Sequence, residues 1–160
     1  MTTHGNLLRE VENLASSAAE PKGLMQRISD HIHAAMSRYN SISFRLVDEA
    51  EPGMLILGPY TGSFNPLERI SFGQGLCGAS ASEERTIVVD DVTKDGRYLT
   101  ASSIVKSEIV VPLFVGGKLF GEMDIQSYFV NTFKAPEDRQ FVEACAGVVA
   151  KYVEAHRKKG

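Results

Sequence analysis

Two strand-like segments joined by a pair of glycines constrain the fold of this 160-residue chain more than any other feature. Ser107–Val115 and Lys118–Ser127 are rich in the β-branched and aromatic side chains that favour pleated strands. Gly116 and Gly117 lie between them and suit the positive φ angles of a two-residue type I′ turn. The sequence therefore predicts an antiparallel hairpin, and with it an antiparallel sheet at the centre of the fold.

Shorter strands are predicted between residues 41 and 89. Ser41–Val47 alternates between a face that carries Ile42 and Phe44 and a face that carries Ser43 and Arg45. Further strands are predicted at Met54–Leu57, which Gly58-Pro59 ends, at Arg69–Phe72 and at Thr86–Val89. These segments add to the sheet that the hairpin begins.

Apolar residues spaced three and four apart predict helices at both ends of the chain. Two such stripes lie within Leu7–Ala18 and Leu24–Tyr39, and the last helix begins at Pro136. The chain is long enough for one core and too short for two ordinary domains. We expect a single α+β domain, in which residues 1–40 form N-terminal helices and residues 41–160 form the core with its C-terminal helix. The terminal helices would pack on one face of the sheet and leave the other for a pocket.

Composition excludes several classes of function. A formal net charge of −3 argues against a nucleic-acid-binding surface. The longest apolar stretch, Ile109–Val115, is far shorter than the roughly 20 residues that cross a bilayer. The N-terminus also lacks signal-peptide features, so we expect a cytoplasmic protein without membrane contact. Cys77 and Cys145 form neither a disulfide framework nor a zinc motif, and we expect no metal and no cofactor.

The pattern Gly73-x-Gly75-x-x-Gly78 has the letters of a dinucleotide-binding fingerprint. That fingerprint requires a parallel βαβ unit, which the short segment after Gly78 does not support. The alternative is a tight turn from a strand into a helix. In that case, the free N–H groups at the start of the helix would face an adjacent cavity.

Five segments together carry a family resemblance: Phe72–Gly78, Val88–Val92, Tyr98-Leu99, Lys106–Pro112 and Gly121–Ile125. In order and spacing they resemble the GAF domains grouped with free methionine-(R)-sulfoxide reductases. The similarity runs from about Ser41 to Val153. It implies a GAF fold, in which a central antiparallel sheet is flanked by terminal helices and the ligand is enclosed by the sheet and its loops.

The cysteines depart from the pattern of these reductases. Their catalytic cysteine corresponds to Ala101, and a further family cysteine corresponds to a position near Pro66. Reduction of a sulfoxide needs a thiolate and a second thiol that resolves the product as a disulfide. Cys77 matches the remaining family cysteine and is the one catalytic candidate, so the resemblance favours binding over catalysis.

The chain has some of the acidic residues with which these reductases bind their substrate. Glu108 and Asp124 match positions at which the reductases hold the amino group of free methionine sulfoxide, and Gln126 replaces the next family acid. The alternative for Asp124 is a solvated face of an edge strand. We predict ligand contacts from Phe44, Tyr60, Leu76, Cys77, Asp91, Ala101, Glu108, Asp124 and Gln126.

Three functions remain open at this point. The first is a non-catalytic sensor that binds a small polar or anionic metabolite. It would signal through its terminal helices, either as a homodimer or to a partner signalling protein. The second is an altered reductase that uses Cys77 with an external thiol. The third is a protein-interaction domain whose core is filled and binds no ligand.

Overall fold

The computed structural model describes residues 3–62, 66–99 and 103–157. In chain order, the elements are α1 (Thr3–Ser17), α2 (Pro21–Ala35), β1 (Ser41–Val47), β2 (Met54–Gly62), β3 (Arg69–Ser71), α3 (Gly75–Glu83), β4 (Ile87–Val89), the 3-10 helix η1 (Val92–Lys94), β5 (Ser107–Val115), β6 (Lys118–Ser127) and α4 (Pro136–Arg157). Among these described residues, no helix is both long and apolar enough to span a membrane.

The strands form one curled sheet in the order β3-β2-β1-β6-β5-β4, and every neighbouring pair is antiparallel. The predicted hairpin is confirmed with both of its strand boundaries. Gly116 and Gly117 have φ angles of 60° and 79°, as a type I′ turn requires. The two long strands lie near the centre of the sheet and contribute side chains to both of its faces.

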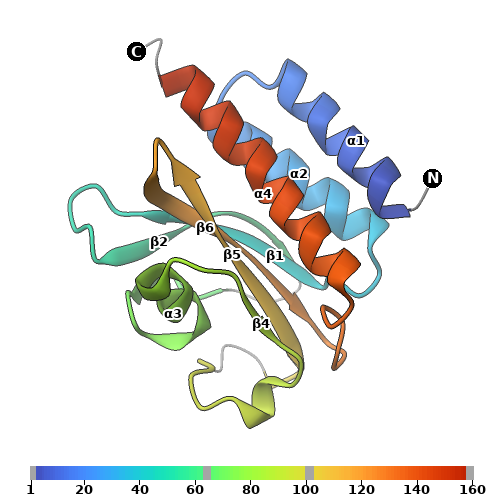
Figure 1. The fold of residues 1–160 in the computed structure, drawn as a ribbon, viewed down its shortest axis with the longest axis vertical. Helices are drawn as coiled ribbons and strands as arrows, with labels where there is room; N and C mark the ends of the chain where they lie inside the picture. Colours follow the sequence, from blue (N-terminus) through green and yellow to red (C-terminus); the bar gives the residue numbers. More distant parts are fainter. Residues whose placement is uncertain (1–2, 63–65, 100–102, 158–160) are drawn as a thin grey trace.

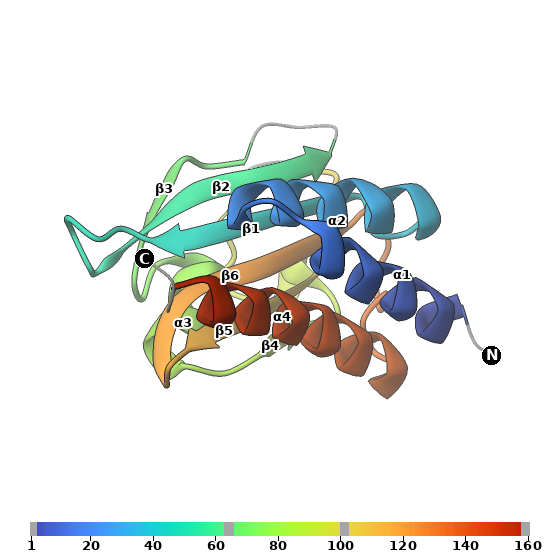
Figure 2. The ribbon, with the colours of Figure 1, turned by 90° about the horizontal axis from the view of Figure 1, so that it is seen from above.

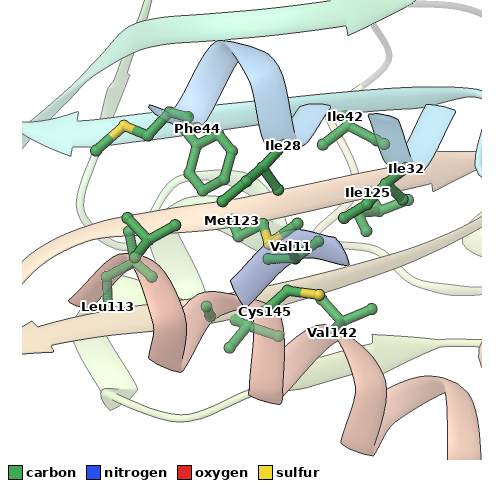
Figure 3. Close-up of a cluster of buried hydrophobic side chains, with 14 of the residues drawn as sticks. Val11, Ile28, Ile32, Ile42, Phe44, Leu113, Met123, Ile125, Val142 and Cys145 are labelled. Atoms are coloured by element: carbon green, nitrogen blue, oxygen red, sulfur yellow. The ribbon is translucent and has the colours of Figure 1, made fainter. Parts of the chain in front are cut away.

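Helices α1, α2 and α4 cover one face of the sheet, and α3 lies on the other (Figure 1 and Figure 2). Between the three helices and the sheet is the main hydrophobic core, to which Ile42, Phe44, Met123 and Ile125 contribute from β1 and β6 (Figure 3). A second, smaller hydrophobic cluster surrounds α3. The expected α+β architecture, with the terminal helices on one face, is thus confirmed.

Strand β2 is longer than the sequence predicts, because it continues through Gly58-Pro59 to Gly62. The pairing with β1 shifts here: Ser43 pairs with Tyr60, whereas Arg45 pairs with Leu57. One residue of β1 is thus opposed by two of β2, which is a β-bulge. Because a bulge leaves one residue outside the ladder, it tolerates a proline without an N–H group.

The glycine motif shapes the turn between β3 and α3. Gly73 and Gly75 have positive φ angles of 84° and 67°, which favour glycine. A Cβ atom on Gly78 would lie 2.4 Å from the carbonyl oxygen of Ser71, so no side chain fits there. Strands β3 and β4 lie at opposite ends of the antiparallel sheet, so they do not form a parallel βαβ unit with α3. The dinucleotide interpretation is therefore wrong, and the tight-turn alternative is correct.

Candidate functional site

A cavity lies on the α3 side of the sheet, where the first turn of that helix meets β1, β5 and β6. The empty space of this cavity measures about 430 Å³, part of which opens to solvent. Its lining residues are Ser41, Ser43, Arg45, Pro66, Leu67, Ile70, Gly75, Leu76, Cys77, Tyr98, Leu99, Glu108, Asp124 and Gln126. The expected pocket on the face opposite the terminal helices is therefore present.

Strand alternation decides which side chains reach this cavity. Because Met123 and Ile125 point into the core below the helices, Asp124 and Gln126 point to the other face. Strand register then places the polar side chains together: Ser43 pairs with Asp124, and Gln126 pairs with both Ser41 and Glu108. Neighbouring strands thus present a continuous polar surface to the cavity.

Three carboxyl groups are buried at or beside the cavity. Glu108, Glu122 and Asp124 have exposed fractions of 3%, 0% and 4%. The Cys77 thiol donates to Asp124 Oδ2 over 3.3 Å, and Gln126 Nε2 donates to Glu108 Oε1 over 3.3 Å. Asp124 Oδ1 and both carboxylate oxygens of Glu122 make no hydrogen bond of ordinary geometry among the described residues, although Cys77 and Ser80 lie near enough to Glu122 to lower its pKa. The alternative of a solvated Asp124 does not hold.

This environment favours protonated acids. Burial raises the pKa of Glu108 well above its ordinary value, and the neighbouring negative charge of Asp124 raises it further. The pKa of Glu122 is raised by the same two causes in the same order. Arg45 opposes both effects, because its positive charge favours the ionised carboxylates. Glu108 and Glu122 therefore hold protons that exposed glutamates would release.

Arg45 is the main site residue that the ligand-contact prediction omits. Its side chain has an exposed fraction of 3%, and Nη1 donates to the carbonyl oxygen of Leu67 over 2.6 Å. The buried Nε atom has no partner among the described residues. The sequence did contain a signal, since Arg45 belongs to the face of β1 opposite Ile42 and Phe44.

Five of the predicted contact residues do line the cavity, namely Leu76, Cys77, Glu108, Asp124 and Gln126. They come from α3, β5 and β6, which meet only in the folded chain. Ala101, the position that corresponds to the reductases' catalytic cysteine, lies outside the described residues. Serines 41 and 43 join the cavity without having been predicted, because alternation places them beside Arg45.

The structure corrects three other predicted contacts, which do not reach the cavity. Phe44 is fully buried in the core beneath the helices, because alternation along β1 turns it away from Ser43 and Arg45. Tyr60 lies on β2 with an exposed fraction of 37%. Asp91 is the N-cap of η1, where its side chain accepts from the backbone N–H of Thr93. Phe44 therefore packs in the core, Tyr60 lies at the surface, and Asp91 caps η1.

The two cysteines are both free and buried, and they belong to separate hydrophobic clusters on opposite faces of the sheet. Burial raises the pKa of the Cys77 thiol well above its ordinary value, and the charges of Asp124, Glu122 and Glu108 add to this. Burial likewise raises the pKa of Cys145 to about 12. The structure therefore holds both thiols in the protonated form, which is a poor nucleophile.

We expect iodoacetamide to alkylate both native cysteines at pH 8 more than about tenfold more slowly than free cysteine, because each pKa unit lowers the thiolate fraction about tenfold. Mass spectrometry of quenched samples measures the rate at Cys77 and Cys145 separately. Denatured protein is the control and should react at both sites at the rate of free cysteine. Rapid alkylation of native Cys77 at pH 8 would contradict the protonated thiol.

Comparison with known proteins agrees with this geometry. A family model described as GAF domain matches residues 24–153. GAF domain-containing protein A of Dictyostelium discoideum is 30% identical over 86% of this chain and 85% of its own length. A free methionine-R-sulfoxide reductase of Saccharomyces cerevisiae is 35% identical over 70% of this chain and 62% of that protein.

The fold is also that of a solved reductase. The X-ray structure of free methionine-R-sulfoxide reductase from Neisseria meningitidis in complex with its substrate superposes with a TM-score of 0.91 at 28% sequence identity. The superposition covers 98% of this chain and 92% of that chain. The family model, the relatives and the architecture agree over most of the chain, and the chain therefore belongs to the GAF domain family.

Proposed function

We propose that the cavity binds a small metabolite with an ammonium group, and that the protein is a non-catalytic sensor of this metabolite. The observation that carries the proposal is the unpartnered Oδ1 acceptor of Asp124, which is buried in the lining of the cavity. A buried acceptor without a donor is costly, and a buried carboxylate needs a positive partner. An ammonium group supplies three donors and the compensating charge.

The other polar groups around the cavity suit a carboxylate on the same metabolite. Arg45 has a buried Nε atom without a partner among the described residues. The first turn of α3, which includes Gly75 and Leu76, also lines the cavity and supplies N–H groups and a positive helix end. A zwitterionic, amino-acid-like metabolite fits both halves of the site. Free methionine-R-sulfoxide reductases among the relatives support this class of ligand by their name. The acidic lining favours a polar zwitterion over the anionic metabolite that the sequence analysis also allowed.

A thermal-shift series with free amino acids, including methionine and its sulfoxide, tests the proposal. We expect an amino acid to stabilise the protein by about 2.7 kcal/mol at a hundredfold excess over its Kd. The corresponding 2-hydroxy acid lacks the ammonium group and should give no shift.

Glu108→Gln removes a buried acidic group from the lining and should abolish the shift, whereas Glu154→Gln changes an exposed glutamate on α4 and should preserve it. A library of amino acids and amines that gives no shift with the wild-type protein would refute the proposal.

We propose catalysis by an altered reductase as the second candidate, because the Cys77 thiol lines the same cavity and several relatives are named reductases. This function requires thiol-dependent reduction of free methionine sulfoxide that Cys77→Ser abolishes and Cys145→Ser retains. Two features favour binding instead: the thiol is held protonated, and the second cysteine lies across the sheet. Absence of turnover at saturating sulfoxide and external thiol would exclude the reductase.

Signalling, assembly and location are parts of the same proposal. The apolar stripes of α1 and α4 pack inside the domain, where Leu7, Val11, Cys145 and Val149 are buried. A homodimer through the terminal helices, or a partner signalling protein, would therefore contact other residues of α1 and α4.

Free, buried cysteines agree with the reducing cytoplasm as the proposed location. A ligand-free interaction domain is the remaining alternative, and the thermal-shift series separates it from a sensor.

A further inference from the structure

Three side chains in the cavity offer a sulfur and two carboxylates to a common point. The Sγ atom of Cys77 and one carboxylate oxygen each from Glu108 and Asp124 lie within 4.8 Å of one another, and all three residues are buried. They come from α3, β5 and β6, so the sheet and the helix fix their positions. The sequence expectation of no metal rested on the absence of a Cys-x-x-Cys motif, which cannot detect donors that separate strands bring together.

Acceptors within and beside this cluster have no donor among the described residues. The hydrogen bond from Cys77 occupies only Oδ2 of Asp124, while Oδ1 is buried and has no partner among the described residues. Glu122 is fully buried two residues earlier on β6, and neither of its carboxylate oxygens has a partner in the described part of the chain. Arg45 balances only one of the three carboxylates when all are ionised. The cavity and its surroundings therefore offer lone pairs that no described donor uses.

We propose that Cys77, Glu108 and Asp124 form a binding site for a divalent cation of the zinc class. Thiolate is a soft ligand and carboxylate is a hard one, so this mixed set suits Zn²⁺ better than Mg²⁺ or Ca²⁺, which take oxygen ligands. On binding, the Cys77 thiol and the Glu108 carboxyl release their protons to solvent. The sulfur then bonds to the ion in place of its hydrogen bond to Asp124. Three protein ligands leave the fourth tetrahedral position for water.

Neighbouring groups support these ligands. Gln126 donates to Oε1 of Glu108 and so orients that carboxylate toward the cluster, as residues around metal ligands commonly do. The metal site shares its cavity with the proposed metabolite, but it does not rest on that proposal. An ion on Glu108 and Asp124 removes acceptors that an ammonium group would use, so metal and metabolite should compete.

Cobalt titration of the full chain, first freed of metal with a chelator, tests the site. Co²⁺ replaces Zn²⁺ in such sites and gives a thiolate-to-cobalt charge-transfer absorption that a histidine or carboxylate site lacks. We expect this absorption to saturate at one Co²⁺ per chain and to disappear when Zn²⁺ is added.

Cys77→Ser should abolish the absorption, whereas Cys145→Ser, which changes the other buried cysteine, should retain it. No charge-transfer absorption with the wild-type protein, or an unchanged absorption with Cys77→Ser, would overturn the proposal.

A second measurement applies if the Cys77 variant does not fold. Zn²⁺ should slow alkylation of Cys77 in the wild-type protein at least tenfold, because a metal-bound sulfur is unavailable, and it should leave Cys145 unaffected. In Asp124→Asn, whose fold is checked by circular dichroism, this protection should be lost. Equal alkylation of Cys77 with and without Zn²⁺ would refute the site. The amino-acid thermal shifts are measured in chelator, so failure of one proposal leaves the other testable.

Discussion

Replacing Arg45 with methionine should destabilise the protein by about 3 to 5 kcal/mol, the cost of removing one partner from a buried charged network. Arg45 lies among Glu108, Glu122 and Asp124, and its positive charge favours the ionised forms of Glu108 and Glu122. Its Nη1 atom also holds the carbonyl oxygen of Leu67. Methionine keeps most of the apolar stem, so the loss isolates the charge and the hydrogen bond.

Urea denaturation at pH 7.5 measures this change in the free energy of unfolding. Arg139→Met is the matched control, because Arg139 has an exposed fraction of 51% and pairs only with Glu143 on the same helix. We expect that control to change stability by less than about 0.5 kcal/mol. An equally small effect at Arg45 would show that water enters the cluster and screens its charges.

Glu122→Gln should have the opposite effect and stabilise the metal-free protein at neutral pH by about 1 to 3 kcal/mol, the cost of an unsatisfied buried polar group. Both carboxylate oxygens of Glu122 lack a partner among the described residues, and the side chain is fully buried. Glutamine has nearly the same shape and carries no charge, so it removes most of the desolvation cost. Its amide N–H groups can also donate to nearby acceptors.

The pH dependence of this effect has a defined sign. Because burial raises the pKa of Glu122 in the folded state, the folded protein holds this proton more tightly than the unfolded chain. The protonated carboxyl group contributes fully to the free energy of unfolding below the ordinary glutamate pKa of about 4.3. This contribution is lost as the pH rises through the pKa that Glu122 has in the folded state. The advantage of Glu122→Gln should therefore be absent near pH 4. It should grow with pH by at most about 1.4 kcal/mol per unit.

Denaturation midpoints from pH 4 to pH 8 in the presence of a chelator measure this profile. Glu154→Gln changes an exposed glutamate and should follow the wild-type curve throughout. In the double variant, Glu122→Gln should recover part of the stability lost in Arg45→Met, because the two charges belong to one network. Lower stability of Glu122→Gln at pH 7.5 would mean that the ionised carboxylate has a strong partner.

Local patterns in the sequence were sufficient to predict most of the fold. The central hairpin was predicted to the residue, because Gly116-Gly117 and the flanking strands agree on one structure. The extension of β2 through Gly58-Pro59 was missed, since a proline usually ends a strand. Only the register with β1, in which Ser43 pairs with Tyr60 and Arg45 with Leu57, reveals the bulge that accommodates this proline.

The site was predicted less completely, for a physical reason. Motif resemblance identified Glu108 and Asp124, which strand register then brings to one cavity. Phe44 was predicted as a ligand contact, although its alternation with Ser43 and Arg45 already placed it on the core face of β1. The grouping of a thiol with two carboxylates depends on the packing of α3 against β5 and β6, which no local spacing encodes.

Alternation along β6 couples the cavity to the core on the opposite face of the sheet. Asp124 faces the cavity, and its immediate neighbours Met123 and Ile125 support the core beneath the helices. Protein interiors are packed as densely as organic crystals, so a strand cannot shift on one side without disturbing contacts on the other. A shift of Asp124 on ligand binding would therefore move Met123 and Ile125 as well. The displacement would reach the core contacts of α4 through a single strand.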